Sequence, residues 1–106
     1  MRFKINGIEW QTVEVPSSDG SLRRSDGSLS VGVTDNGTYC IYLSKSLRGA
    51  FKRKVMIHEV CHAFMFSYGI LIPIEQEEFI CDFVATYGDD IFSVVDMMER
   101  TMKRAI

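Results

Sequence analysis

The sequence predicts an α+β fold in which a small N-terminal antiparallel or mixed sheet of about three strands precedes three helices. Two segments rich in β-branched and aromatic residues occupy the first 43 residues, each around a turn-forming pair. From Ser44 onward the chain reads as helical. Strands that are followed by helices, rather than alternating with them, are typical of the α+β class. With 106 residues, the chain is expected to form a single domain spanning residues 1–106.

The predicted strands lie in two segments with a turn at the middle of each. The first, FKINGIEWQTVEV, surrounds the pair Asn6-Gly7, which is a strong short-range signal for a hairpin. The second, LSVGVTDNGTYCIYL, places two short strands around residues 35–37. Between them the pentapeptide SDGSL occurs twice, flanking Arg23 and Arg24. This repeat is too short for a solenoid unit, so we interpret it as two turns on a mobile loop.

Glycine and proline divide the helical part of the chain. A first helix is predicted within residues 44–69, where Gly69 ends it, and a second from Pro73 to about Tyr87. Gly88 is expected to break that second helix, and Asp89 or Asp90 to cap a third one.

Composition gives no reason to expect binding to nucleic acid or to a membrane. The formal net charge is -2 at pH 7, too small to attract polyanions through overall charge. No apolar stretch approaches the roughly 20 residues that cross a bilayer. An odd number of cysteines, three, and the lack of an apolar leader segment favour a reducing compartment. We therefore expect a soluble cytoplasmic protein, monomeric or forming a small oligomer.

The strongest chemical signal lies in the predicted first helix. The segment His58-Glu59-Val60-Cys61-His62 matches H-E-x-x-H and holds both histidines of the chain. On a helix, two histidines four residues apart project from one face and can bind a single zinc ion. Apolar residues surround the motif on almost every side, which is typical of an interior helix. Buried imidazoles need partners, so the context favours metal binding over a chance match.

A catalytic zinc site needs a third protein ligand and one open position. On the predicted second helix, Glu78 and Asp82 lie one turn apart, on the side that carries small residues. Close approach to the first helix would present both acids to the histidines. We predict Glu78 as the third ligand and Asp82 as the acceptor that holds one imidazole N–H. Glu77 is the main alternative ligand, and Glu75 is a weaker one.

Cysteine ligands are a further alternative, because Cys61 lies inside the motif and Cys81 neighbours Glu78. The chain has no C-x-x-C spacing, however, and Cys61 beside His62 would reach the same ion awkwardly. All three cysteines are therefore interpreted as core residues.

The two motifs together resemble the ImmA/IrrE family of zinc metallopeptidases. Its members combine H-E-x-x-H with a downstream helix of pattern E-x-x-A-[ND]-x-F-A. Glu78, Asp82 and Ala85 match that pattern, whereas Cys81 replaces its first alanine and Val84 its phenylalanine. The spacing of the acids is also similar to that of gluzincins. SprT-like proteins are a weaker resemblance, because their third ligand is usually a histidine.

The resemblance implies a minimal zincin-like fold and a zinc metalloendopeptidase with one Zn²⁺ per chain. Glu59 would then accept a proton from the zinc-bound water. The substrate would be a protein or peptide, such as a repressor encoded by a phage or prophage. It could bind as an added strand along the sheet edge formed by Thr38–Leu43. The alternative is a non-catalytic zinc-binding module that serves phage regulation or assembly. Helix geometry singles out no residue as the oxyanion donor.

Overall fold

The computed structural model of the chain describes residues 1–104 and contains a four-stranded mixed sheet. Strands β1 (Arg2–Ile5) and β2 (Ile8–Val15) form one antiparallel hairpin, and β3 (Gly32–Asp35) and β4 (Cys40–Ser44) form another. β2 and β4 pair in parallel, so the order across the sheet is β1-β2-β4-β3. The α+β class is confirmed, with four strands in place of about three.

Local residue chemistry explains the two hairpin turns. Asn6 and Gly7 have φ angles of 50° and 79°, the left-handed pair that an Asn-Gly turn requires. In the second turn, the Asp35 carboxylate accepts a hydrogen bond of 2.8 Å from the backbone N–H of Gly37. Asparagine, aspartate and glycine therefore form the two turns at the positions that the sequence pattern predicts.

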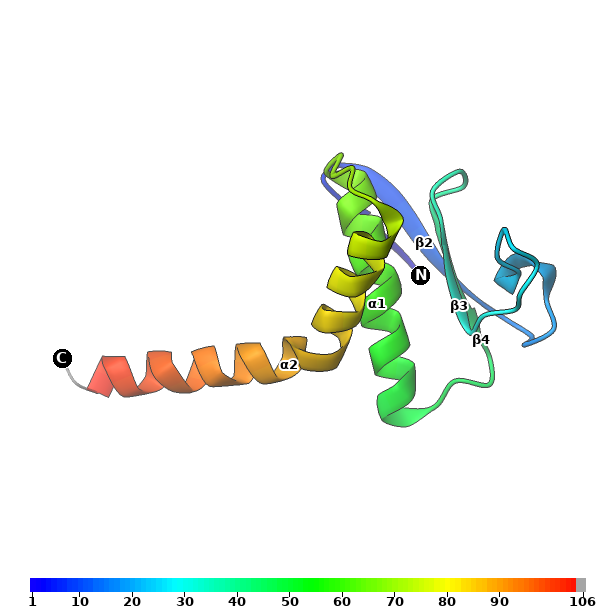
Figure 1. Cartoon of the computed structure of the whole chain (residues 1–106). Coiled ribbons are helices and arrows are strands. Elements are labelled where there is room, and N and C mark those ends of the chain that lie inside the picture. The colour runs from blue at the N-terminus through cyan, green and yellow to red at the C-terminus, as the bar shows by residue number, and fades with distance from the viewer. Residues whose placement is uncertain (105–106) are drawn as a thin grey trace.

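Helix α1 (Gly49–Ser67) lies between the sheet and helix α2 (Ile74–Arg104), as Figure 1 shows. The sheet and α1 share the core, which consists of Ile5, Trp10, Ile41, Leu43, Leu47, Val55 and Ala63. The Trp10 indole N–H donates a buried hydrogen bond of 2.8 Å to the hydroxyl of Ser67. This bond fixes the C-terminal end of α1 against the first hairpin. The interior position predicted for α1 holds in part, since Phe64 and Phe66 remain exposed.

The prediction of three helices is wrong, because α2 continues through Gly88 to Arg104. A single glycine costs a helix only about 1 kcal/mol relative to alanine, and it neither removes a backbone donor nor clashes as proline does. Asp89, expected to cap a third helix, instead forms a two-pronged ion pair with Arg53 of α1, with both N–O distances 2.7 Å. The Arg53 hydrogen bond lowers the pKa of the Asp89 carboxyl.

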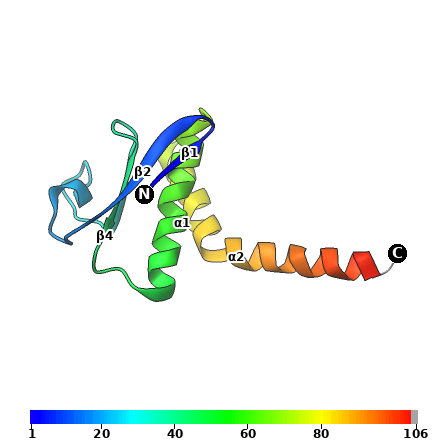
Figure 2. The same cartoon turned by 180° about the vertical axis from the view of Figure 1, so that it is seen from behind.

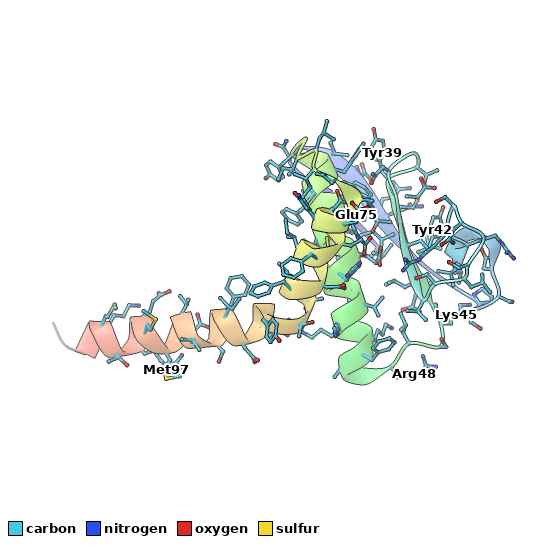
Figure 3. All side chains as sticks on the ribbon, in the orientation of Figure 1. Tyr39, Tyr42, Lys45, Arg48, Glu75 and Met97 are labelled. Atoms are coloured by element: carbon cyan, nitrogen blue, oxygen red, sulfur yellow. The ribbon has the colours of Figure 1, made fainter. Side chains whose placement is uncertain are left out.

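The second half of α2 leaves the body of the molecule. In Figures 1 and 2 the orange and red turns of α2 extend away from the sheet and from α1. Figure 3 shows side chains standing out along this segment, Met97 among them. Its exposed apolar residues are Ile91, Phe92, Val94, Val95, Met97, Met98 and Met102. No helix within residues 1–104 is long and apolar enough to cross a membrane.

The sheet edge near α1 differs from the one expected. Residues 38–43 overlap β4, which is paired on both sides and therefore offers no free edge. In the second hairpin, β4 pairs with β2, so β3 has a neighbour on one side only. The free edge on this side of the sheet therefore belongs to β3. Ser44 N–H bonds to Val31 C=O across the strand pair, and antiparallel bonds alternate along a strand. The backbone N–H and C=O of Thr34 therefore point toward the free edge.

Candidate metal centre

Helix α1 places His58 and His62 one turn apart, with their ring nitrogens facing each other. The two Nε2 atoms are 3.1 Å apart, and the ring centroids are 4.8 Å apart. Both side chains are largely buried, with 15% and 11% of their surface exposed. The spacing follows directly from the helix, because residues four apart lie one above the other on the same face.

Helix α2 brings Glu78 to the same point. One Glu78 oxygen is 3.2 Å from Nε2 of His58, and the other is 3.0 Å from Nε2 of His62. One ligand atom from each of the three residues lies within 4.8 Å of the others. His58, His62 and Glu78 therefore form a possible metal-binding triad.

Two more carboxylates hold the outer nitrogens of the imidazoles. Asp82 Oδ1 lies 2.8 Å from Nδ1 of His58, and Glu77 Oε2 lies 2.6 Å from Nδ1 of His62. A carboxylate at this place fixes the tautomer and the orientation of a metal-binding imidazole. Asp82 lies where the helix pattern expected it. Glu77, the main alternative to Glu78 as third ligand, instead lies at Nδ1 of His62, on the opposite side of the ring from Glu78.

The remaining alternatives are not part of the triad. Glu75 is exposed in the first turn of α2 (Figure 3). Cys81 is fully buried, and this burial raises the pKa of its thiol, with a further contribution from the neighbouring Cys61 thiol. Both thiols are free, as is that of Cys40. Cys40 and Cys81 are core residues, and Cys61 is half-buried between α1 and α2.

The arrangement suits a cation. If the Nδ1 atoms donate to Asp82 and Glu77, the two Nε2 atoms and the Glu78 oxygens are acceptors that lie close together. A divalent cation among the three groups would give each of these acceptors a partner.

The donor atoms lie close enough to share one ion. The two Nε2 atoms are 3.1 Å apart, and each lies 3.0–3.2 Å from a different oxygen of the Glu78 carboxylate. With one oxygen of Glu78 as ligand, the three ligand atoms lie within 4.8 Å of one another. Two imidazoles and one carboxylate are also the donor set of a catalytic zinc site with an open fourth position.

Glu59 lies beside the triad and belongs to the buried part of α1, with 6% of its surface exposed. Its Oε2 is 4.0 Å from Nε2 of His58. The Thr34 hydroxyl on β3 lies 2.9 Å from Glu59 Oε1 and 2.8 Å from its backbone oxygen. The carboxylate is thereby held in a fixed position without being a member of the triad.

Gly32 on β3 makes room for Glu59, and sequence reasoning missed both Gly32 and Thr34. A Cβ at Gly32 would lie 2.8 Å from Val55 Cγ1 and 3.1 Å from Glu59 Cγ. The signal was present, because an isolated glycine inside a strand pattern often marks close backbone approach.

A cleft of about 620 Å³ opens over these groups. One wall consists of the triad, Glu59 and the first turns of α2, and β3 from Gly32 to Asp35 forms the floor. The opposite wall is the loop with the two SDGSL segments, which includes the short helix η1 (Gly20–Leu22). Both segments form turns, as expected from the sequence.

Comparison with known families agrees with this geometry. The family model described as the IrrE N-terminal-like domain, a peptidase family, matches residues 5–92. The match includes β2, β3, β4, α1 and the part of α2 that carries Glu77, Glu78 and Asp82. A search of the curated proteins finds no significant match. The chain belongs to the IrrE N-terminal-like peptidase family.

Proposed function

We propose that the chain is a zinc-dependent metallopeptidase that hydrolyses a peptide bond in a protein substrate. The observation that carries the proposal is the triad of His58, His62 and Glu78, whose ligand atoms lie within 4.8 Å of one another. Family membership supports peptidase chemistry of this kind. One zinc ion per chain would be held by these three residues.

When bound, zinc would lower the pKa of a water molecule and polarise the scissile carbonyl. Glu59 is the residue that would take the proton and deliver it to the leaving amine. Its carboxylate lies near the triad and accepts a hydrogen bond from Thr34. Asp82 and Glu77 would keep the two imidazoles in the tautomer that presents Nε2.

The free edge of β3 is the place where a peptide would bind. It lies on the floor of the cleft, and its outward backbone N–H and C=O at Thr34 could pair with an extended substrate. The substrate itself is proposed from the family resemblance as a regulatory protein such as a phage repressor. Incubation with the products of neighbouring genes, followed by mass spectrometry, tests this part.

Metal analysis of protein purified without a histidine tag tests the ligand set. We expect about one zinc per chain in the natural protein and a large loss of zinc in Glu78→Ala. The matched control is Glu75→Ala, which removes an exposed carboxylate from the same helix and should retain zinc. Full zinc content in Glu78→Ala would contradict the assignment of Glu78.

Glu59→Gln tests the catalytic role separately. The amide keeps the size of the side chain but cannot accept the proton, so zinc should stay bound while cleavage is lost. Cleavage at the natural rate by this variant would exclude Glu59 as the general base.

A second candidate function is a non-catalytic zinc module that binds a partner. The exposed apolar side chains between Ile91 and Met102 of α2 favour it, because such surfaces often mark protein contacts. The buried Glu59 argues against it, since a structural site has no use for a base. In this case chelation would lower the thermal stability, and no peptide bond would be cut.

A further inference from the structure

The loop of residues 17–30, with its two SDGSL segments, forms one wall of the cleft rather than a distant surface. Five residues of this loop line the same cleft as the triad and Glu59, namely Gly20, Ser21, Arg23, Arg24 and Ser25. In Figure 1 the loop stands beside β3 and β4, in the blue-to-cyan part of the chain. Its side chains are therefore close to any peptide bound along β3.

The loop is built to hold a defined shape. Leu22 is fully buried and anchors it to the sheet. Asp19 accepts hydrogen bonds from the backbone N–H and the hydroxyl of Ser21, at 2.9 and 2.6 Å. Asp26 makes the same two bonds to Ser28, again at 2.9 and 2.6 Å. A loop that is already ordered before binding loses less conformational entropy when a ligand binds.

Two arginines between the turns of this loop are among the residues that line the cleft. Arg23 Nη1 donates to the backbone oxygen of Gly27 at 3.0 Å, and Arg24 Nη2 donates to the hydroxyl of Ser30 at 3.2 Å. Neither guanidinium forms an ion pair within residues 1–104. Each guanidinium has five N–H donors in a planar fork. Most of these donors remain available to a ligand.

Acidic and basic residues of the cleft lining lie on different elements. The carboxylates come from α1, α2 and β3, and they are Glu59, Glu77, Glu78 and Asp35. The loop contributes Arg23 and Arg24, and the Asp26 carboxylate of the same loop lies near Arg24. A carboxylate on a bound peptide would be repelled by the acids and attracted by the arginines. The cleft would therefore orient such a peptide as well as select it.

Arg24 also lines an adjoining hollow of about 260 Å³ beside His58. Lys54 of α1 faces the same hollow and adds a second cation. The acids on its lining are Glu59 and Asp82, and these are occupied by Thr34 and His58. This hollow offers a place for one side chain next to the triad.

We propose that Arg23 and Arg24 form a carboxylate subsite that selects peptides with an acidic side chain or a free carboxyl terminus near the scissile bond. This inference rests on the proposed peptidase function. The arginine fork pairs with both oxygens of a carboxylate, which an uncharged amide cannot reproduce.

Binding of three labelled peptides tests the subsite in the zinc-loaded Glu59→Gln chain, which should not cut them. The first is an acetylated and amidated Ala/Gly hexapeptide with one central Glu, and the second has Gln in its place. The third has Gln and a free carboxyl terminus. Fluorescence anisotropy should show binding about three- to tenfold tighter for at least one carboxylate peptide than for the amidated Gln peptide. The first and third peptides separate an acidic side chain from a chain end.

The double variant Arg23→Ala/Arg24→Ala should remove this preference, with zinc content and melting temperature unchanged. Arg23→Lys/Arg24→Lys keeps the charge without the fork and should recover part of the preference. Arg100→Ala, on the exposed part of α2, is the matched control and should keep all of it. Equal binding of the three peptides, no binding of any, or a preference that persists in the alanine variant would each overturn the inference.

Hydrolysis of a mixed peptide library separates this inference from the proposed function. If the natural chain cuts peptides and shows no enrichment of carboxylates near the cut bond, the peptidase function stands and the subsite is refuted. If it cuts none but the binding preference depends on Arg23 and Arg24, the peptidase function fails while the anion site remains.

Discussion

Replacing Gly32 by alanine tests the contact between the edge strand and the helix that carries the metal-binding motif. The added Cβ would lie 2.8 Å from Val55 Cγ1 and 3.1 Å from Glu59 Cγ, whereas carbon atoms pack best at about 3.5–4.0 Å. β3 and α1 must therefore separate by several tenths of an ångström. Val55 is 9% exposed, and a valine in a helix has essentially one χ1 rotamer, so it cannot turn away.

Overpacking of this kind costs about 1–3 kcal/mol. Each kcal/mol lowers the melting temperature by about 4–8 °C in a domain of this size. Thermal unfolding followed by circular dichroism, with zinc present, measures the effect. The displacement of Glu59 should also reduce hydrolysis more than it reduces zinc content, because Glu59 is not a proposed ligand.

Gly20→Ala is the matched control. A Cβ at Gly20 would meet no atom within 4 Å, and its φ angle is not in the left-handed range. This variant should stay within about 0.5 kcal/mol of the natural chain. If Gly32→Ala melts at the same temperature as Gly20→Ala, β3 does not approach α1 as closely as we describe.

Three further predictions concern single side chains. Glu77→Gln should weaken zinc binding about 10- to 100-fold in competition with a chelating dye, because the His62 ring loses its charged acceptor; an unchanged affinity would exclude this role. Ser67→Ala leaves the buried Trp10 N–H without its acceptor and should cost about 1–3 kcal/mol in urea unfolding. A smaller loss would mean that water replaces the hydroxyl. Because burial raises the pKa of the Cys81 thiol, iodoacetamide at pH 8 should modify Cys81 only after the protein is unfolded. Mass spectrometry measures the modification, and a modified Cys81 in the native protein would contradict this prediction.

The candidate site could be read from the sequence where its geometry is local. His58 and His62 come together through one turn of helix, which the motif spacing contains. The position of Glu78 could be predicted because small residues, Cys81 among them, mark the side of the second helix that approaches the first. The position of Glu77 could not be predicted, because it depends on how α1 and α2 cross. Neighbouring residues of α2 reach opposite sides of the His62 ring only in that crossing.

The fold was predictable to a similar degree. Both hairpins follow from local turn chemistry, but the parallel pairing of β2 with β4 joins residues such as Gln11 and Cys40, which are far apart in the chain. Such pairing is decided by the shared core, which includes Trp10 and Ile41. The free edge of the sheet follows from that pairing, so placing it at residues 38–43 was wrong for a non-local reason. Gly88 was misjudged because helix propensity is a weak signal beside the continuous pattern around it.

The residues at two positions of β3 are explained by contacts with α1 rather than by pairing within the sheet. Gly32 and Thr34 are two residues apart, so both face α1. There, the first leaves space for the Glu59 side chain, and the second donates a hydrogen bond to it. Glycine is among the residues that strands disfavour, and a buried carboxylate is costly unless it is hydrogen-bonded. These two costs occur at one contact, on the strand that also forms the floor of the cleft. A site that only held a metal would need neither residue, so the pair of Gly32 and Thr34 is the part of the fold that supports Glu59 as a base.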